Sequence, residues 1–119
     1  MVKKYSRGEN VQLSKNFHLR EFECKCGKCP HTLVDTEHIK KLQELRDTIG
    51  PVNITSAYRC EAHNASVGGS SNSQHKLGTA TDIQSKTLTP AEVASHCEVF
   101  AGLGRYNTFT HIDSRKARW

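Results

Sequence analysis

The sequence contains no long hydrophobic run, and none of its apolar stretches approaches the about 20 residues that a membrane-spanning helix requires. We therefore expect no membrane insertion. The apolar segment of a secretory signal peptide is also missing, because the polar residues 5–10 follow the basic Lys3 and Lys4. We expect synthesis in the cytoplasm.

Aromatic residues are few, at 7% of the chain, and they are not interleaved with basic residues as in proteins that stack on nucleic-acid bases. Lysine and arginine number 17 against 12 acidic residues, and the net charge of +5 favours a polyanionic partner. The basic residues are scattered, apart from Arg115-Lys116-Ala117-Arg118. An anionic cell wall is therefore a better expected partner than nucleic acid.

The sequence has no internal repeat, and its 119 residues are too few for two domains that each bury a core. We expect one domain over residues 1–119 that acts as a monomer. The polar residues 1–16 should form an extended or loosely docked N-terminal arm.

The five cysteines cannot all pair within one chain, so at least one thiol is free, bound to a metal or paired with another molecule. Three stand close together in Cys24-Lys25-Cys26-Gly27-Lys28-Cys29, and His31 follows. This segment lacks a second cysteine pair at zinc-finger spacing, although Cys60 and His63 would complete a site if the fold brought them near. We expect a loop with free or partly paired thiols, and a second, cysteine-bound ion is the less favoured alternative.

The clearest secondary-structure pattern predicts a helix over residues 36–49. Asp35 or Thr36 can cap its first turn, apolar residues recur at intervals of three and four, and Gly50-Pro51 ends it.

A second helix should begin at Thr89-Pro90-Ala91-Glu92, because Thr caps a first turn, Pro suits its first position and Glu completes a capping box. Its expected buried residues are Val93, Cys97 and Phe100, and the expected breakers are Gly102 and Gly104. Alternating and β-branched segments predict strands over residues 52–56, 79–83 and 109–113. A short helix or turn is expected over residues 60–67.

Residues 73–82, Ser73-Gln74-His75-Lys76-Leu77-Gly78-Thr79-Ala80-Thr81-Asp82, hold a histidine and an aspartate in one short segment. A glycine followed by β-branched residues predicts a loop that enters a strand, and not a helix. Thr110-His111-Ile112-Asp113 follows the same scheme in the last strand. Two adjacent strands could therefore direct Asp82 and His111 toward one ion, with His75 closing the site from the loop.

Three nitrogen and oxygen ligands suit zinc and leave a position for water, which is the arrangement of a catalytic site for peptide or amide hydrolysis. The alternative is chance, because seven histidines make accidental pairs common and a histidine beside an aspartate is more often a hydrogen-bonding residue. Tyr58 and Arg59 pose the same choice. An arginine after a strand can hold a substrate carboxylate but is more often a solvated charge.

Taken together, Ser56-Ala57-Tyr58-Arg59, the pattern Ser-x-His-x-x-Gly-x-Ala-x-Asp over residues 73–82 and His111-Ile112-Asp113 resemble peptidase family M15. This family comprises zinc D-Ala-D-Ala carboxypeptidases and related peptidoglycan endopeptidases, including phage endolysins. The similarity extends over residues 16–119. It implies an α+β fold with helices packed on a small antiparallel sheet, the fold shared with hedgehog signalling domains.

The resemblance also implies roles for individual residues. His75, Asp82 and His111 would bind one catalytic zinc ion. Arg59 would recognise a carboxylate of the wall peptide, since a guanidinium matches a carboxylate with two hydrogen bonds. The other expected substrate-binding residues are Tyr58 and Ser73.

The general base does not follow from the resemblance. Several family members have an acidic residue three positions before the last histidine ligand, where this chain has Thr108, and others have a second histidine where it has Phe109. Asp113 is the nearest carboxylate on the predicted face and is our candidate base, with support of a metal ligand as the alternative. Tyr106 is a second candidate, as a hydrogen-bond donor to the oxyanion.

These inferences predict a zinc metallopeptidase that hydrolyses peptide bonds in peptidoglycan stem peptides, as a carboxypeptidase or an endopeptidase. A phage enzyme that is released to act at the host cell wall fits the absence of a signal peptide. Two rivals remain: a non-catalytic, zinc-containing binding module of the same fold, and a nucleic-acid-binding zinc knuckle built on the three clustered cysteines. The knuckle is the least favoured.

Overall fold

The structure, a computed structural model, describes residues 2–69, 73–97, 100 and 102–114, apart from the Arg105 side chain. These residues form two antiparallel sheets and three α-helices, which confirms the predicted α+β class. The elements in chain order are β1 (Val2–Ser6), the 3-10 helix η1 (Leu19–Phe22), β2 (His31–Asp35), α1 (Thr36–Ile49), β3 (Val52–Ser56), α2 (Glu61–Ser66), the 3-10 helix η2 (Gln74–Leu77), β4 (Ala80–Ser85), α3 (Pro90–Ala94), β5 (Gly102–Arg105) and β6 (Thr110–Asp113).

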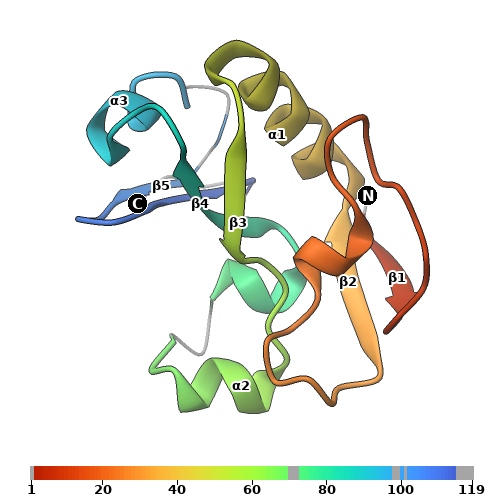
Figure 1. Cartoon of the computed structure of the whole chain (residues 1–119). Helices are drawn as coiled ribbons and strands as arrows, with labels where there is room; N and C mark the ends of the chain where they lie inside the picture. Colours follow the sequence, from red (N-terminus) through yellow and green to blue (C-terminus); the bar gives the residue numbers. More distant parts are fainter. Residues whose placement is uncertain (1, 70–72, 98–99, 101, 115–119) are drawn as a thin grey trace.

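The larger sheet has the strand order β3-β4-β6-β5, and all neighbouring strands in it are antiparallel. A separate two-stranded sheet consists of β1 and β2. In Figure 1, α3 packs beside β5 and β6 at one end of the larger sheet, and α2 lies beyond the end of β3. The central strands β4 and β6 have neighbours on both sides, so they form a rigid support for functional side chains.

The helix predicted over residues 36–49 is confirmed as α1. The Asp35 carboxylate accepts a hydrogen bond from the Glu37 N–H at 3.3 Å and caps the first turn, and Gly50, with a φ of 87°, ends the helix. The apolar face belongs to the main core, with Ile39, Leu42, Leu45 and Ile49 all buried. Each such side chain contributes about 1.5–3 kcal/mol on burial, so this face anchors α1.

The second predicted helix, α3, begins where expected but is shorter. Thr89 and Glu92 form the predicted capping box, and the helix ends at Ala94. Beyond it, the N–H groups of Cys97 and Phe100 each donate to the carbonyl three residues back, at 3.1 and 3.2 Å. These tighter turns replace the expected helix and still bury the predicted residues Val93, Cys97 and Phe100.

Three predicted strands are confirmed as β3, β4 and β6 with small shifts at their ends, and the short helix over residues 60–67 is confirmed as α2. Three other strands, β1, β2 and β5, were not predicted. The first part of the expected N-terminal arm is extended but paired, since β1 aligns with β2. Gly102 and Gly104, the expected helix breakers, instead lie in β5, which pairs with β6. None of the helices in the described part of the chain is long and apolar enough to cross a membrane.

Candidate active site

The strands β4 and β6 bring two of the predicted metal ligands together. Asp82 is the direct cross-strand partner of His111. Directly opposed residues of antiparallel strands point to the same face, and here Asp82 Oδ1 lies 2.8 Å from His111 Nδ1. The predicted convergence of these two strands is therefore present in the structure.

His75 reaches the same point from η2, a single 3-10 turn where the sequence predicted a loop. The Ser73 Oγ caps this turn by accepting the His75 N–H at 3.2 Å. Gly78 ends it with a φ of 75°, and a Cβ at this position would collide with the Leu33 carbonyl. Glycine is therefore required for η2 to pack against β2 and to hold His75 Nε2 at 3.3 Å from Asp82 Oδ1.

Hydrogen bonds determine which nitrogen of each histidine faces Asp82. The Nδ1 of His75 lies 2.7 Å from the Ala57 carbonyl, which can only accept, so Nδ1 carries the proton and Nε2 presents a lone pair. The Nε2 of His111 lies 2.9 Å from the Asp113 carboxylate, so it donates there and Nδ1 faces Asp82. Acceptors of this kind orient the histidines of metal sites.

The donor atoms of His75, Asp82 and His111, here called the histidine–aspartate site, fit a zinc ion. One atom from each residue lies within 4.8 Å of the others. Two imidazoles and a carboxylate form a ligand set that catalytic zinc takes, with one position left for water or substrate. The side chains of His75, Asp82 and His111 are 3%, 8% and 12% exposed, so the protein encloses most of the site.

The charges of this site attract a cation. Burial raises the pKa of Asp82, but its hydrogen bonds with His111 and His75 outweigh burial and lower the pKa to about 2. Burial lowers the pKa of His111, whereas the hydrogen bonds with Asp113 and Asp82 raise it by more, so the net shift is upward. Two carboxylates therefore stabilise positive charge around the His111 ring.

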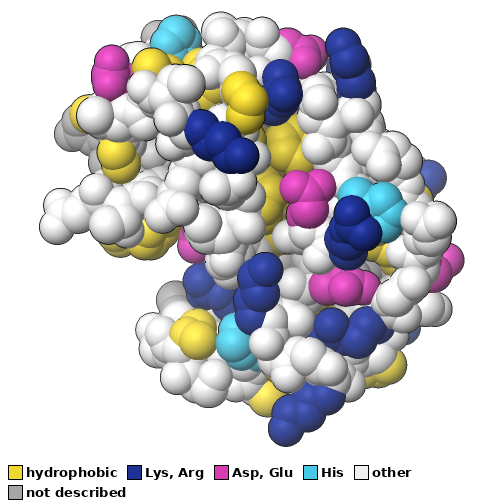
Figure 2. Space-filling view, viewed as in Figure 1, with side chains coloured by type: hydrophobic (Ala, Val, Ile, Leu, Met, Phe, Trp, Pro, Cys, Tyr) yellow, Lys and Arg dark blue, Asp and Glu magenta, His cyan; other side chains and the backbone are white. Residues whose placement is uncertain are grey.

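The histidine–aspartate site opens on a cavity of about 410 Å³ between the end of α2 and the turn that joins β5 to β6. Figure 2 shows the surface indented between these two parts of the molecule, with Lys and Arg side chains on the α2 side. A volume of this size is in the usual range of ligand pockets. The other residues that line the cavity are Arg59, Val67, Gly68, Gly69, Ser73, Tyr106 and Phe109.

Arg59 is held in place at the edge of the site. Its Nε donates to Ser56 Oγ and its Nη1 to Asn64 Oδ1, both at 3.2 Å. Its Nη2 lies 3.5 Å from Asp82 Oδ2, and the side chain is only 17% exposed, so Arg59 is not a solvated charge. Five N–H groups are more than these three contacts use, which leaves donors for a ligand. Ser56 belongs to the sequence motif of Arg59 but was given no role there, and sequence reasoning missed Asn64, which reaches Arg59 from α2.

Two other predicted site residues, Ser73 and Tyr106, line the cavity. Tyr106 is 51% exposed and stacks on Phe109, with ring centroids 4.5 Å apart and planes inclined by 11°. The stacked pair gives the cavity an aromatic wall with a phenolic hydroxyl. From the sequence, Phe109 was considered as the residue in place of a second histidine, and its stacking on Tyr106 was not predicted.

Two predicted site residues, Tyr58 and Asp113, are not among the described residues that line the cavity. Tyr58 is 6% exposed, and its hydroxyl lies 3.3 Å from His31 Nε2. Asp113 is completely buried and contacts the nitrogen of His111 that faces away from Asp82. This position corresponds to the supporting role that was the alternative, and general-base function of Asp113 stays a prediction.

The sequence profile of the family described as Peptidase M15 matches residues 15–113, a range that includes all three residues of the histidine–aspartate site. The chain belongs to peptidase family M15. This finding confirms the resemblance inferred from the motifs. M15 peptidases are zinc-dependent, in agreement with the donor set of the histidine–aspartate site. A comparison with curated proteins finds no match to the chain.

Proposed function

We propose that this M15 chain hydrolyses peptide bonds in peptidoglycan stem peptides, as a D-Ala-D-Ala carboxypeptidase or as an endopeptidase of the endolysin type. The observation that carries the proposal is the grouping of His75, Asp82 and His111 at a cavity that Arg59 also lines. Family membership supports a zinc peptidase of the peptidoglycan-acting kind. The net charge of +5 supports association with an anionic wall.

Each residue has a defined part in this reaction. His75, Asp82 and His111 would hold a zinc ion, which would supply Lewis acidity for the scissile carbonyl and a water molecule with a pKa lowered to about 7. Arg59 binds a carboxylate of the stem peptide and so places the neighbouring peptide bond beside the metal ligands. The Tyr106 hydroxyl donates a hydrogen bond to the carbonyl oxygen on which negative charge develops.

Asp113 positions His111. Its carboxylate accepts the Nε2 proton of His111 and so keeps Nδ1 directed toward the metal. The same bond stabilises the ring as an electron donor to the ion. Substitution of Asp113 by asparagine distinguishes this positioning role from removal of a proton from water.

Product analysis tests the proposal. Zinc-loaded protein is incubated with a defined stem pentapeptide and with a cross-linked stem dimer, and the products are identified by mass. Loss of the terminal D-Ala indicates a carboxypeptidase, and cleavage of the dimer or within the stem indicates an endopeptidase. Absence of any product while zinc occupies the histidine–aspartate site would reject the enzymatic function.

A non-catalytic zinc-containing binding module is the second candidate, and one observation favours it. Among the described residues that line the cavity, Asp82 is the only carboxylate, and it belongs to the ligand set. No separate general base therefore faces the cavity in this part of the chain. The module predicts that the zinc-loaded protein binds the pentapeptide and releases it unchanged, which calorimetry and mass analysis together would show.

A further inference from the structure

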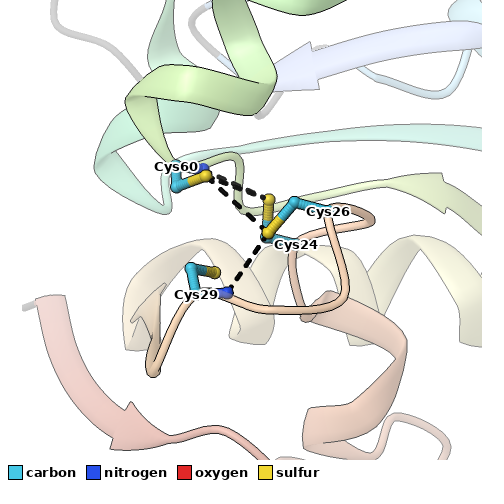
Figure 3. A group of neighbouring side chains, drawn as sticks. All are labelled: Cys24, Cys26, Cys29 and Cys60. Carbon is cyan, nitrogen blue, oxygen red and sulfur yellow. Dashed lines mark hydrogen bonds between the residues drawn. The ribbon is translucent and has the colours of Figure 1, made fainter.

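A second group of metal-binding side chains lies outside the histidine–aspartate site. The thiols of Cys24, Cys26, Cys29 and Cys60, here called the cysteine site, point toward one another (Figure 3). Three belong to the loop between η1 and β2, and Cys60 is the N-cap residue of α2. The fold brings these segments together although β2, α1 and β3 separate them in the chain.

The distances between the sulfur atoms match a tetrahedral zinc site. Cys60 Sγ lies 3.7 Å from Cys24 Sγ and 3.8 Å from Cys26 Sγ, and all four sulfur atoms lie within 4.8 Å of one another. With Zn–S bonds of about 2.3 Å, tetrahedral geometry separates two sulfur atoms by about 3.8 Å. A disulfide requires about 2.0 Å and would use only two of the four thiols, and all five cysteines of the chain are free thiols here.

Backbone N–H groups point at two of these sulfur atoms. Cys26 Sγ accepts the N–H of Lys28 at 3.5 Å and that of Cys29 at 3.3 Å. Cys24 Sγ accepts the N–H of Cys60 at 3.3 Å. Donors at this position stabilise the thiolate, which is the form that binds a metal.

Arg7 brings positive charge to the cysteine site. Its Nη2 lies 3.2 Å from Cys29 Sγ and 3.9 Å from Cys26 Sγ. The same atom donates to the Cys24 carbonyl at 2.8 Å, which holds the guanidinium against the loop. Four thiolates around one divalent ion carry a net negative charge, and a neighbouring guanidinium offsets part of it.

The fifth cysteine has a different environment. Cys97 is completely buried, and its thiol donates to the Val93 carbonyl at 3.1 Å. Burial raises the pKa of this thiol to about 11, so it stays protonated. The odd number of cysteines is thus explained, because four form the cysteine site and the fifth, Cys97, lies in the core.

We propose that Cys24, Cys26, Cys29 and Cys60 bind a structural zinc ion that ties the loop between η1 and β2 to the start of α2. Four protein donors complete a tetrahedral zinc ion and leave no position for a substrate, so this ion stabilises structure. Cys60 directly follows Arg59 in the chain. The ion therefore also fixes the segment that presents Arg59 to the cavity.

Zinc X-ray absorption on the His111→Ala variant of the full chain tests the proposal, because this variant lacks a ligand of the histidine–aspartate site. We expect two zinc ions per chain in the wild type and one in the variant. The retained ion should have four sulfur neighbours at about 2.3 Å. A shell of nitrogen and oxygen, or a variant without zinc, would overturn the proposal.

Ligand variants give a reciprocal test. Cys26→Ser and Cys29→Ser should each lower the zinc content from two ions to one. Lys28→Ala, exposed in the same loop, and Cys97→Ala, outside the site, should retain both ions. Unchanged zinc content in the two serine variants would refute the assignment. These measurements are independent of hydrolysis, so failure of the cysteine site and failure of the proposed function give different results.

The wild-type protein offers a test that does not depend on the folding of a variant. Protein purified under reducing conditions is titrated with a mercurial reagent in the presence of a zinc-sensitive dye. We expect release of one zinc ion as four thiols react, ahead of the buried Cys97. Four reactive thiols without released zinc, or a disulfide within the cysteine site, would contradict the proposal.

Discussion

The histidine–aspartate site and the cysteine site are built on different supports. Asp82 and His111 lie on the two central strands of the larger sheet, and His75 is held by a turn that packs against β2. The cysteine site lies on one irregular loop and one helix end. Three donors beside a cavity suit chemistry on a substrate, whereas four donors that enclose an ion suit the stabilisation of loops that lack a sheet beneath them.

The largest expected effect is the loss of zinc and activity at the histidine–aspartate site while the cysteine site keeps its zinc ion. His111→Ala removes a donor and should abolish zinc binding at the histidine–aspartate site. Hydrolysis of the stem pentapeptide should fall by more than about 100-fold, since loss of only a ligand's hydrogen-bond partner already costs about 10- to 100-fold. Product formation and zinc content are measured on the same sample.

Asn53→Ala is the matched control for this variant. Asn53 is exposed on β3 of the same sheet and takes no part in the site. It should retain both the zinc content and the activity of the wild type. Full zinc occupancy in His111→Ala would show that the ligand set is wrong.

The second prediction concerns stability. Cys60→Ser should lower the free energy of unfolding by at least about 3 kcal/mol, a fraction of the about 10–16 kcal/mol that structural zinc contributes in zinc-finger peptides. Denaturant titration at constant zinc concentration measures the change. His111→Ala should change the stability less, because the sheet supports its site without the ion. A larger loss in His111→Ala than in Cys60→Ser would contradict the contrast between the two sites.

The same contrast explains what could be predicted from the sequence. The segment of residues 73–82 holds two of three ligands of the histidine–aspartate site, and alternation along the last strand placed the third. The cysteine site could not be predicted as well, because Cys60 meets the loop only after β2, α1 and β3 have folded. The contact of Asn64 with Arg59 was hidden for the same reason, since packing sets it. The contact of Asp113 with His111 is local to β6, and support of a metal ligand by Asp113 was one of the two roles expected from the sequence.

The fold shows the same division between local and distant causes. The caps at Asp35 and Thr89 are local, and both predicted helix starts are correct. The pairing of β1 with β2 depends on residues far apart in the chain, and β1 is mostly polar and exposed. Cross-strand context outweighed local preference in β5, where Gly102 and Gly104 lie opposite Asp113 and His111.

The third prediction separates the two roles of Asp113. Asp113→Asn keeps an acceptor for the His111 ring but removes the charge. We expect zinc affinity at the histidine–aspartate site to fall by about 10- to 100-fold and activity to return at saturating zinc. Metal titration with the pentapeptide assay measures both. Persistent loss of activity at full zinc occupancy would instead identify Asp113 as the general base.

The fourth prediction concerns substrate recognition. Arg59→Lys keeps the charge but loses the planar fork that binds a carboxylate with two hydrogen bonds. We expect KM for the pentapeptide to rise by about 10-fold, the equivalent of about one charge-assisted hydrogen bond, with a smaller change in kcat. The pentapeptide amide, which lacks the terminal carboxylate, serves as the comparison. If the Arg59→Lys substitution weakens the binding of both peptides equally, Arg59 acts on Asp82 and not on the terminal carboxylate of the substrate.

The smallest expected effect concerns His38, a buried histidine outside both sites. Its ring nitrogens are occupied by hydroxyl groups, with Nδ1 2.8 Å from Ser114 Oγ and Nε2 3.1 Å from Thr81 Oγ1. Burial lowers its pKa to about 4, although the charges of Asp35 and Asp113 act in the opposite direction. The unfolded chain takes up this proton near pH 6.5 and the folded chain only near pH 4. Its contribution to stability is therefore complete above about pH 6.5 and is lost as the pH falls toward about 4.

From this residue alone, the free energy of unfolding should fall by about 1 kcal/mol between about pH 7 and pH 5.5. Denaturant titrations of the wild type and of His38→Gln at several pH values measure this decrease as a difference between the slopes of the free energy of unfolding against pH. Proton uptake at the two metal sites affects both proteins alike and cancels in the comparison. The glutamine side chain can hydrogen-bond to a hydroxyl group but does not titrate, so the variant should lack this component. If the free energies of unfolding of the two proteins change with pH in parallel, the folded protein accommodates a charged His38. Burial would then not keep His38 neutral, and this prediction would be wrong.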